Sequence, residues 1–164
     1  MSSPLGTFGF SLTGALFLLA LVLPNIIWAV VAKPKGYGQH RENRVFQFLE
    51  RVGQALTAAT AVLFTDTNPG PWSPWSWWFV GALVLLAAYE GCWIRYFTSR
   101  RTMQDFNRSL LGLPVPLAIL PVGAFLLLGI YGRLVPLIVA AIVLGIGHIG
   151  VSLDNARSAE KAEA

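Results

Sequence analysis

The chain has 164 residues, of which 55% are hydrophobic and only 12% are charged, and its mean hydropathy is +0.60. This balance excludes an ordinary soluble globule, in which apolar and charged residues alternate along every element. The net charge of +4 does not indicate nucleic-acid binding, because the basic residues lie between hydrophobic segments and not on one amphipathic surface.

The first predicted helix covers residues 9–32 and is apolar on all sides for most of its length. A secretion signal would carry Lys or Arg before a shorter apolar run, whereas residues 1–10 contain neither. We therefore expect a retained membrane-spanning helix. Pro24 is expected to kink this helix and to free one of its backbone carbonyls.

The second predicted helix, 45–64, is less apolar because Glu50, Arg51 and Gln54 lie in its first half. The connector before helix 45–64 and the connector after helix 75–97 decide whether helix 45–64 spans the membrane. Both are basic, with Lys33, Lys35, Arg41 and Arg44 in the first and Arg100, Arg101 and Arg108 in the second. The positive-inside rule places both connectors in the cytoplasm, so an even number of spans must separate them. Helix 45–64 is therefore predicted to cross the membrane.

The remaining predicted helices are 75–97, 112–130 and 134–151, the last two forming a tight hairpin. The sequence thus predicts an all-α fold, a polytopic membrane helix bundle with five transmembrane helices in one domain, 1–153. Its N-terminus is expected outside and its C-terminus in the cytoplasm, where a polar tail, 154–164, extends the last helix.

Aromatic residues gather at both ends of helix 75–97. Trp72, Trp75, Trp77 and Trp78 crowd its outer start, and Trp93, Tyr96 and Phe97 mark its inner end. Because indole and phenol rings prefer the headgroup region, both groups are expected at the membrane interfaces.

Polar side chains within the predicted spans share one depth in the cytoplasmic leaflet; they are Asn25, Glu50, Glu90 and His148, with Arg51 and Arg95 beside them. Ionisable groups inside a membrane are costly, so each is a candidate functional residue with a partner to be found. Glu90 needs Arg51, His148 or a bound proton as its partner. Arg95 is expected to reach the headgroups without one, and Tyr89 and Cys92 are expected to be packing residues.

Two interpretations of this cluster stay open. In the functional one, Glu90 and His148 exchange protons, with three glycines around His148 and the Pro24-Asn25 pair forming a binding site. In the structural one, a glutamate bridges to Arg51, His148 bonds a carbonyl and Asn25 ties two helices together. No metal site or cofactor is predicted, because one cysteine and two histidines provide no spaced ligand set.

The stretch EGCWIRYF at 90–97, the glycine-rich VLGIGHIG at 143–150 and PNIIWAVVAKP at 24–34 resemble a family of small bacterial integral membrane proteins with no established activity. The resemblance covers roughly the C-terminal half and the end of the first helix. It implies a multi-pass protein of the bacterial plasma membrane and carries no function with it.

Three functions are compatible with these features. The first is small-solute or proton-linked transport through the polar cluster; the second is a membrane scaffold or regulatory subunit that binds partner helices. The third is a membrane-embedded enzyme that acts on lipid headgroups, with His148 or a glutamate as base, although no nucleophile or metal motif accompanies them. The expected partners are the lipid bilayer and a second copy of the chain or another membrane protein, and nucleic acid is not among them.

Overall fold

The computed structural model describes residues 5–35, 37 and 43–163. Helices account for all the regular secondary structure in these residues: α1 (Leu12–Ile27), the π-helix η1 (Trp28–Ala32), α2 (Arg44–Val62), the 3-10 helices η2 (Thr65–Thr67) and η3 (Pro74–Ser76), α3 (Trp77–Phe97), α4 (Met103–Asn107), α5 (Pro116–Tyr131) and α6 (Val135–Glu163). The all-α prediction is confirmed for this part of the chain.

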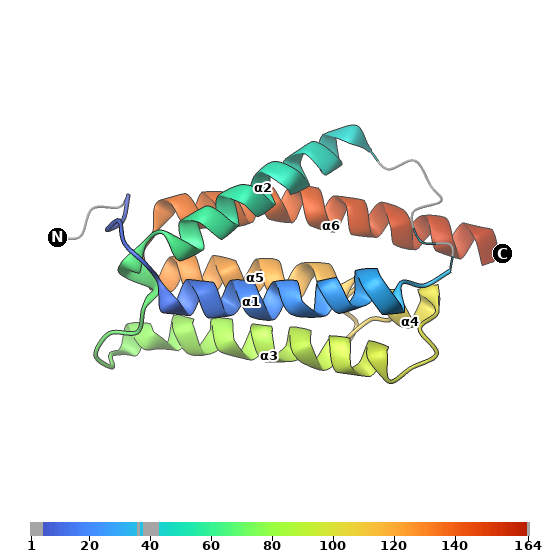
Figure 1. Cartoon of the computed structure of the whole chain (residues 1–164), viewed down its shortest axis with the longest axis horizontal. Coiled ribbons are helices and arrows are strands. Elements are labelled where there is room, and N and C mark those ends of the chain that lie inside the picture. Colours follow the sequence, from blue (N-terminus) through green and yellow to red (C-terminus); the bar gives the residue numbers. More distant parts are fainter. Residues whose placement is uncertain (1–4, 36, 38–42, 164) are drawn as a thin grey trace.

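Four long helices pack successively in the order α3, α5, α6, α2, and α1 contacts both α2 and α3. Figure 1 shows the five helices running along the long axis of the molecule, with α2 inclined away from α1 toward one end. We name the two ends of the bundle by the short helices there. The η2 end also holds the start of α1, and the α4 end also holds the C-terminal part of α6.

In the described part of the chain, three helical segments are long and apolar enough to cross a membrane: Leu12–Ala32, Pro74–Phe97 and Val135–Ala159. The helix Pro116–Tyr131 is apolar but shorter, at about 24 Å for its 16 residues. A helix is present in every predicted segment, and α2 is the least apolar of them because it contains Arg44, Glu50 and Arg51.

The predicted boundaries are wrong in two places. The first helix begins at Leu12 instead of residue 9, because Ser11 is its N-cap and its Oγ accepts a hydrogen bond from the Gly14 N–H. The fourth begins at Pro116 instead of residue 112, because Leu111, Gly112 and Val115 all have positive φ and form a turn. The last helix continues through Glu163, so no break separates the bundle from the predicted tail.

Glycines bring α2 into backbone contact with α6. A Cβ added to Gly147 would lie 2.7 Å from the Cα of Glu50, and one added to Gly53 would lie 2.8 Å from the Cβ of Leu144. Gly150 is similarly covered by the ring of Phe46. Such close approach is what small residues permit between membrane helices. It aligns α2 lengthwise on α6 and fixes the rotation of both helices.

The η2 end is closed by hydrogen bonds and apolar packing. The Thr7 N–H donates to Asp66 Oδ2 at 2.6 Å, and the hydroxyls of Ser11 and Thr67 share a hydrogen bond of 2.7 Å. Beneath them Gly14 lies against the backbone of Ala61, which holds α1 and α2 together. The buried core of this half contains Phe17, Phe125, Leu128, Leu134 and Leu137.

The aromatic residues at the two ends of α3 differ from each other. The tryptophans before and at the start of α3, at 72, 75, 77 and 78, are exposed, as an interfacial belt requires. The interfacial position of Trp93 and Tyr96 stays a prediction; both rings are fully buried within the bundle. The reason is α4, whose Phe106 stacks over Trp28 and packs against both rings.

Candidate functional site

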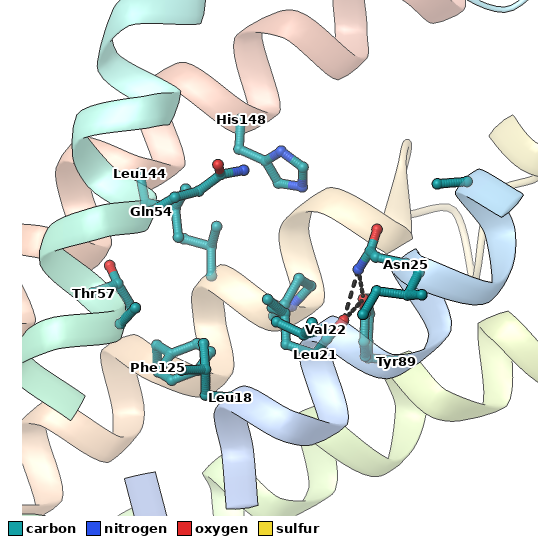
Figure 2. A pocket seen from close by; sticks show the side chains of 15 residues that line it. Leu18, Leu21, Val22, Asn25, Gln54, Thr57, Tyr89, Phe125, Leu144 and His148 are labelled. Carbon is teal, nitrogen blue, oxygen red and sulfur yellow. Dashed lines mark hydrogen bonds between the residues drawn. The ribbon is translucent and has the colours of Figure 1, made fainter. Parts of the chain in front are cut away.

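A cavity of about 430 Å³ lies where α2 diverges from α1, with α5 and α6 forming its floor. Most of its wall is hydrocarbon, contributed by Leu18, Leu21, Val22, Ile26, Ala29, Ala58, Pro121, Val122, Phe125 and Leu144. Five polar side chains complete it: Asn25, Gln54, Thr57, Tyr89 and His148. Figure 2 shows them around the cavity, contributed by α1, α2, α3 and α6. The cavity is thus mostly apolar, with polar groups on several of its sides.

Asn25 is held by two hydrogen bonds at the edge of the cavity (Figure 2). Its Nδ2 donates to the backbone carbonyl of Leu21 and to the hydroxyl of Tyr89, both at 2.7 Å. The Tyr89 hydroxyl in turn donates to the same Leu21 carbonyl at 3.2 Å. This triangle uses the two amide hydrogens of Asn25 and leaves its side-chain oxygen, a hydrogen-bond acceptor, for another group.

Glu50 and His148 form a hydrogen-bonded pair between α2 and α6, with 2.6 Å between Glu50 Oε1 and His148 Nδ1. The side chains are 19% and 30% exposed, respectively. Gln54 Nε2 donates to the same carboxylate oxygen at 3.4 Å. Because Glu50 engages Nδ1, Nε2 is the ring nitrogen of His148 left for a group in the cavity.

Thr57 contributes an unsatisfied polar atom to the cavity wall. Its residue is only 2% exposed, and its Oγ1 has no hydrogen-bond partner in the part of the chain that the structure describes. One turn away, the hydroxyl of Thr60 donates to the Leu56 carbonyl at 2.7 Å, the usual arrangement for a threonine in a helix. A buried hydroxyl without a partner costs about 1–3 kcal/mol, so a polar ligand atom beside Thr57 would recover stability.

A second, smaller cavity of about 70 Å³ lies on the α4 side of the first. The two cavities share Asn25 and His148, and the smaller one is bounded by Trp28, Tyr37, Phe106 and Asn155 among others. Asn25 and His148 therefore form the boundary between a largely apolar space and an aromatic one nearer the end of the bundle.

The structure separates the six predicted site residues. Asn25 and His148 line the cavity, and Glu50 contacts it through His148. The Glu90–His148 pair of the functional interpretation does not form: Glu50 contacts His148 Nδ1 instead, and Glu90 lies on the side of α3 that carries the exposed Leu83 and Ile94. Within the described chain, Glu90 Oε1 is buried without a hydrogen-bond partner.

The two predicted arginines have other roles. Arg95 does not extend free to the headgroups: it donates to the carbonyls of Arg108 at 2.7 Å and Ser109 at 3.1 Å, and so anchors the segment after α4. Arg51 is exposed on α2 and is not among the described residues that line the cavity. Arg41, predicted as a topology determinant, lies outside the described residues.

The sequence interpretation missed Tyr89, which was expected only to pack. It is almost completely buried and its hydroxyl fixes Asn25, one helical position away from Glu90. The signal available in the sequence was its depth, which matches that of Asn25 and His148.

No metal centre is formed by the residues in the described ranges, which contain no group of three or more His, Cys, Asp or Glu side chains that could hold an ion. The chemistry of the site is therefore that of hydrogen bonding, a carboxylate–imidazole pair and hydrocarbon contact. Comparisons with protein-family models, with curated proteins and with solved structures find no match to this chain.

Proposed function

We propose that this chain is a multi-pass protein of the bacterial plasma membrane that takes up amphipathic small molecules into the α1–α2 cavity, as the binding step of proton-linked transport. The observation that carries the proposal is the cavity itself: a hydrocarbon wall with an unsatisfied Thr57 hydroxyl and a carboxylate–imidazole pair at one side. Cavities that bind small ligands have this composition and a volume of about 300–1,000 Å³.

The proposed topology has five spans, with the α4 end in the cytoplasm. Lys33, Lys35, Arg100 and Arg101 lie together at that end, whereas Arg133 is at the η2 end. By the positive-inside rule this asymmetry favours a cytoplasmic α4 end, an outer start of α1 and a cytoplasmic end of α6. The lengthwise packing of α2 on α6 supports a spanning α2.

The ligand class follows from the walls of the cavity. A hydrocarbon chain suits the side chains of α1 and α5, while a polar head suits the hydrogen-bonding groups of Asn25, Thr57 and His148. The closed η2 end and the divergence of α2 from α1 favour entry from the inner leaflet. In this proposal the Glu50–His148 pair is the group whose protonation accompanies binding.

The test is a pair of tryptophan substitutions on neighbouring residues of α2. Ala58 lines the cavity and Ala59 is exposed beside it. We expect wild-type protein in detergent to bind one dodecyl amphiphile per chain, measured calorimetrically with dodecylammonium, laurate and dodecanol in parallel. Ala58→Trp should weaken the binding at least tenfold because the indole fills the cavity, and Ala59→Trp should leave it within about twofold. Equal affinities in the two variants, or no saturable binding to wild type, would refute the proposal.

A scaffold role is the alternative that one observation favours. Glu90 Oε1 is buried without a hydrogen-bond partner among the described residues, Leu83 and Ile94 on the same side of α3 are exposed, and a Cβ at Gly91 would meet open space. A partner helix that supplies a hydrogen-bond donor would suit this face. The enzyme alternative gains no such support, since neither Ser nor Cys is among the described residues that line the cavity.

A further inference from the structure

A depression of about 440 Å³, separate from the cavities of about 430 and 70 Å³, lies at the α4 end of the bundle. Two stretches far apart in sequence form it: Lys33, Pro34 and Lys35 follow η1, and Arg100, Arg101, Thr102 and Met103 lead into α4. Neither stretch lines the α1–α2 cavity, so this basic pocket is distinct from the site of the proposed function.

The charge of the basic pocket is unbalanced. Four of its described lining residues are cationic and none of them is acidic. The nearby Asp105 does not line the pocket but is bonded to Thr102, which does: its Oδ2 accepts from the Thr102 N–H at 3.1 Å and from the Thr102 hydroxyl at 2.9 Å, and these bonds lower the pKa of the carboxyl. Like charges held together are unfavourable, so a bound anion would stabilise this arrangement.

Several contacts hold two of the four cations, Lys33 and Arg101, in place before any ligand arrives. The Lys33 ammonium lies 5.6 Å from the ring centroid of Trp28 and 5.0 Å from that of Tyr37. Arg101 has a φ of 58°, its N–H donates to Ser99 Oγ at 3.1 Å, and its Nε donates to the Phe97 carbonyl at 3.4 Å. Side chains fixed in this way lose less conformational entropy on binding than free ones would.

We infer that the basic pocket binds a phosphate group. A phosphate offers several acceptor oxygens to converging ammonium and guanidinium donors, and arginine matches its geometry with paired N–H groups. The volume leaves room for the substituents of a phosphodiester. Two sources provide this chemistry at the end of a membrane helix bundle: an anionic phospholipid headgroup and a soluble phosphate compound.

The experiment uses full-length protein in nanodiscs that contain phosphatidylglycerol and phosphatidylcholine in equal amounts. Native mass spectrometry after release from the discs measures which lipid remains bound. Wild type should retain phosphatidylglycerol preferentially. In the variant Lys33→Gln/Arg101→Gln, the ratio of retained phosphatidylglycerol to phosphatidylcholine should fall about fivefold for each cation removed, or about 25-fold for both. The matched control, Arg44→Gln/Arg157→Gln, removes two exposed cations outside the pocket and should change it less than twofold.

A parallel arm titrates the detergent-solubilised proteins with inorganic phosphate. Saturable binding that the Lys33/Arg101 variant loses, without a lipid preference in nanodiscs, would assign the pocket to soluble phosphate compounds. If the Lys33/Arg101 variant fails to fold, as judged by circular dichroism, Lys35→Gln/Arg100→Gln replaces it with the same expectation. The inference is overturned if neither phosphatidylglycerol nor phosphate binds, or if pocket and control variants lose binding equally, which would indicate diffuse surface charge.

Discussion

Gly147→Ala is expected to lower the free energy of unfolding by about 2–3 kcal/mol, although alanine is the better helix former. The added methyl would collide with the backbone of Glu50, whose Cα would be 2.7 Å away and whose N would be closer still. Backbone cannot rotate out of the way as a side chain can. The helices α2 and α6 must therefore separate, which also lengthens the Glu50–His148 contact.

Gly91→Ala is the control for this substitution. It adds the same methyl group to a helix of the same bundle, at a position where the Cβ meets nothing within 4 Å. Thermal unfolding of both variants in the same detergent should show a lower melting temperature than wild type for Gly147→Ala and no lower one for Gly91→Ala. Two melting curves that shift together would mean that α2 does not lie against α6 at Gly147.

Removing either partner of the Glu50–His148 pair is expected to cost about 2 kcal/mol of stability. A partner left alone inside the bundle keeps its desolvation cost without its hydrogen bond. We place the cost below that of a fully buried pair because the two side chains are 19% and 30% exposed. Glu50→Gln, His148→Asn and the double variant form a cycle whose coupling energy we expect to be about 1 kcal/mol.

The same variants separate stability from ligand binding. Arg51→Gln, next to Glu50 but exposed, is the control and should leave both unchanged. If the pair only stabilises the packing of α2 on α6, a variant that remains folded will bind dodecyl amphiphiles with the affinity of wild type. If the pair belongs to the site, folded His148→Asn will bind more weakly. Additive effects of the two substitutions on stability would show that the side chains do not interact.

Hydropathy was sufficient to locate four of the long helices, because apolar runs of this length have few alternatives, whereas the less apolar α2 was predicted from the basic connectors that flank helices 45–64 and 75–97. Hydropathy set the start of α5 too early because Leu111 and Val115 adopt positive φ, which non-glycine residues rarely do; Pro114 and Pro116 indicate an irregular start there but do not fix the first residue of the helix. The short helix α4 was missed too. Its capping box, Thr102 with Asp105, is readable only once a helix is suspected there.

Depth along the bundle was predictable, and direction around each helix was not. Counting residues placed Asn25, Glu50 and His148 at one level; the structure brings Asn25 and His148 to one cavity and Glu50 into contact with His148. The same count selected Glu90 over Tyr89, although neighbours on a helix point about 100° apart. Tyr89 faces the cavity and Glu90 does not, since α5 packs on the side of α3 that Tyr89 occupies. The family resemblance stays a prediction.

The unbroken course of α6 has a mechanical consequence. Its 29 residues measure about 43 Å, more than the roughly 30 Å of a hydrocarbon core, so in the proposed topology one end of this helix projects from the bilayer. His148 sits partway along it. Any twist or tilt imposed on the projecting end, by a bound protein or by the membrane surface, is transmitted through a rigid helix to the imidazole and to the width of the opening it borders.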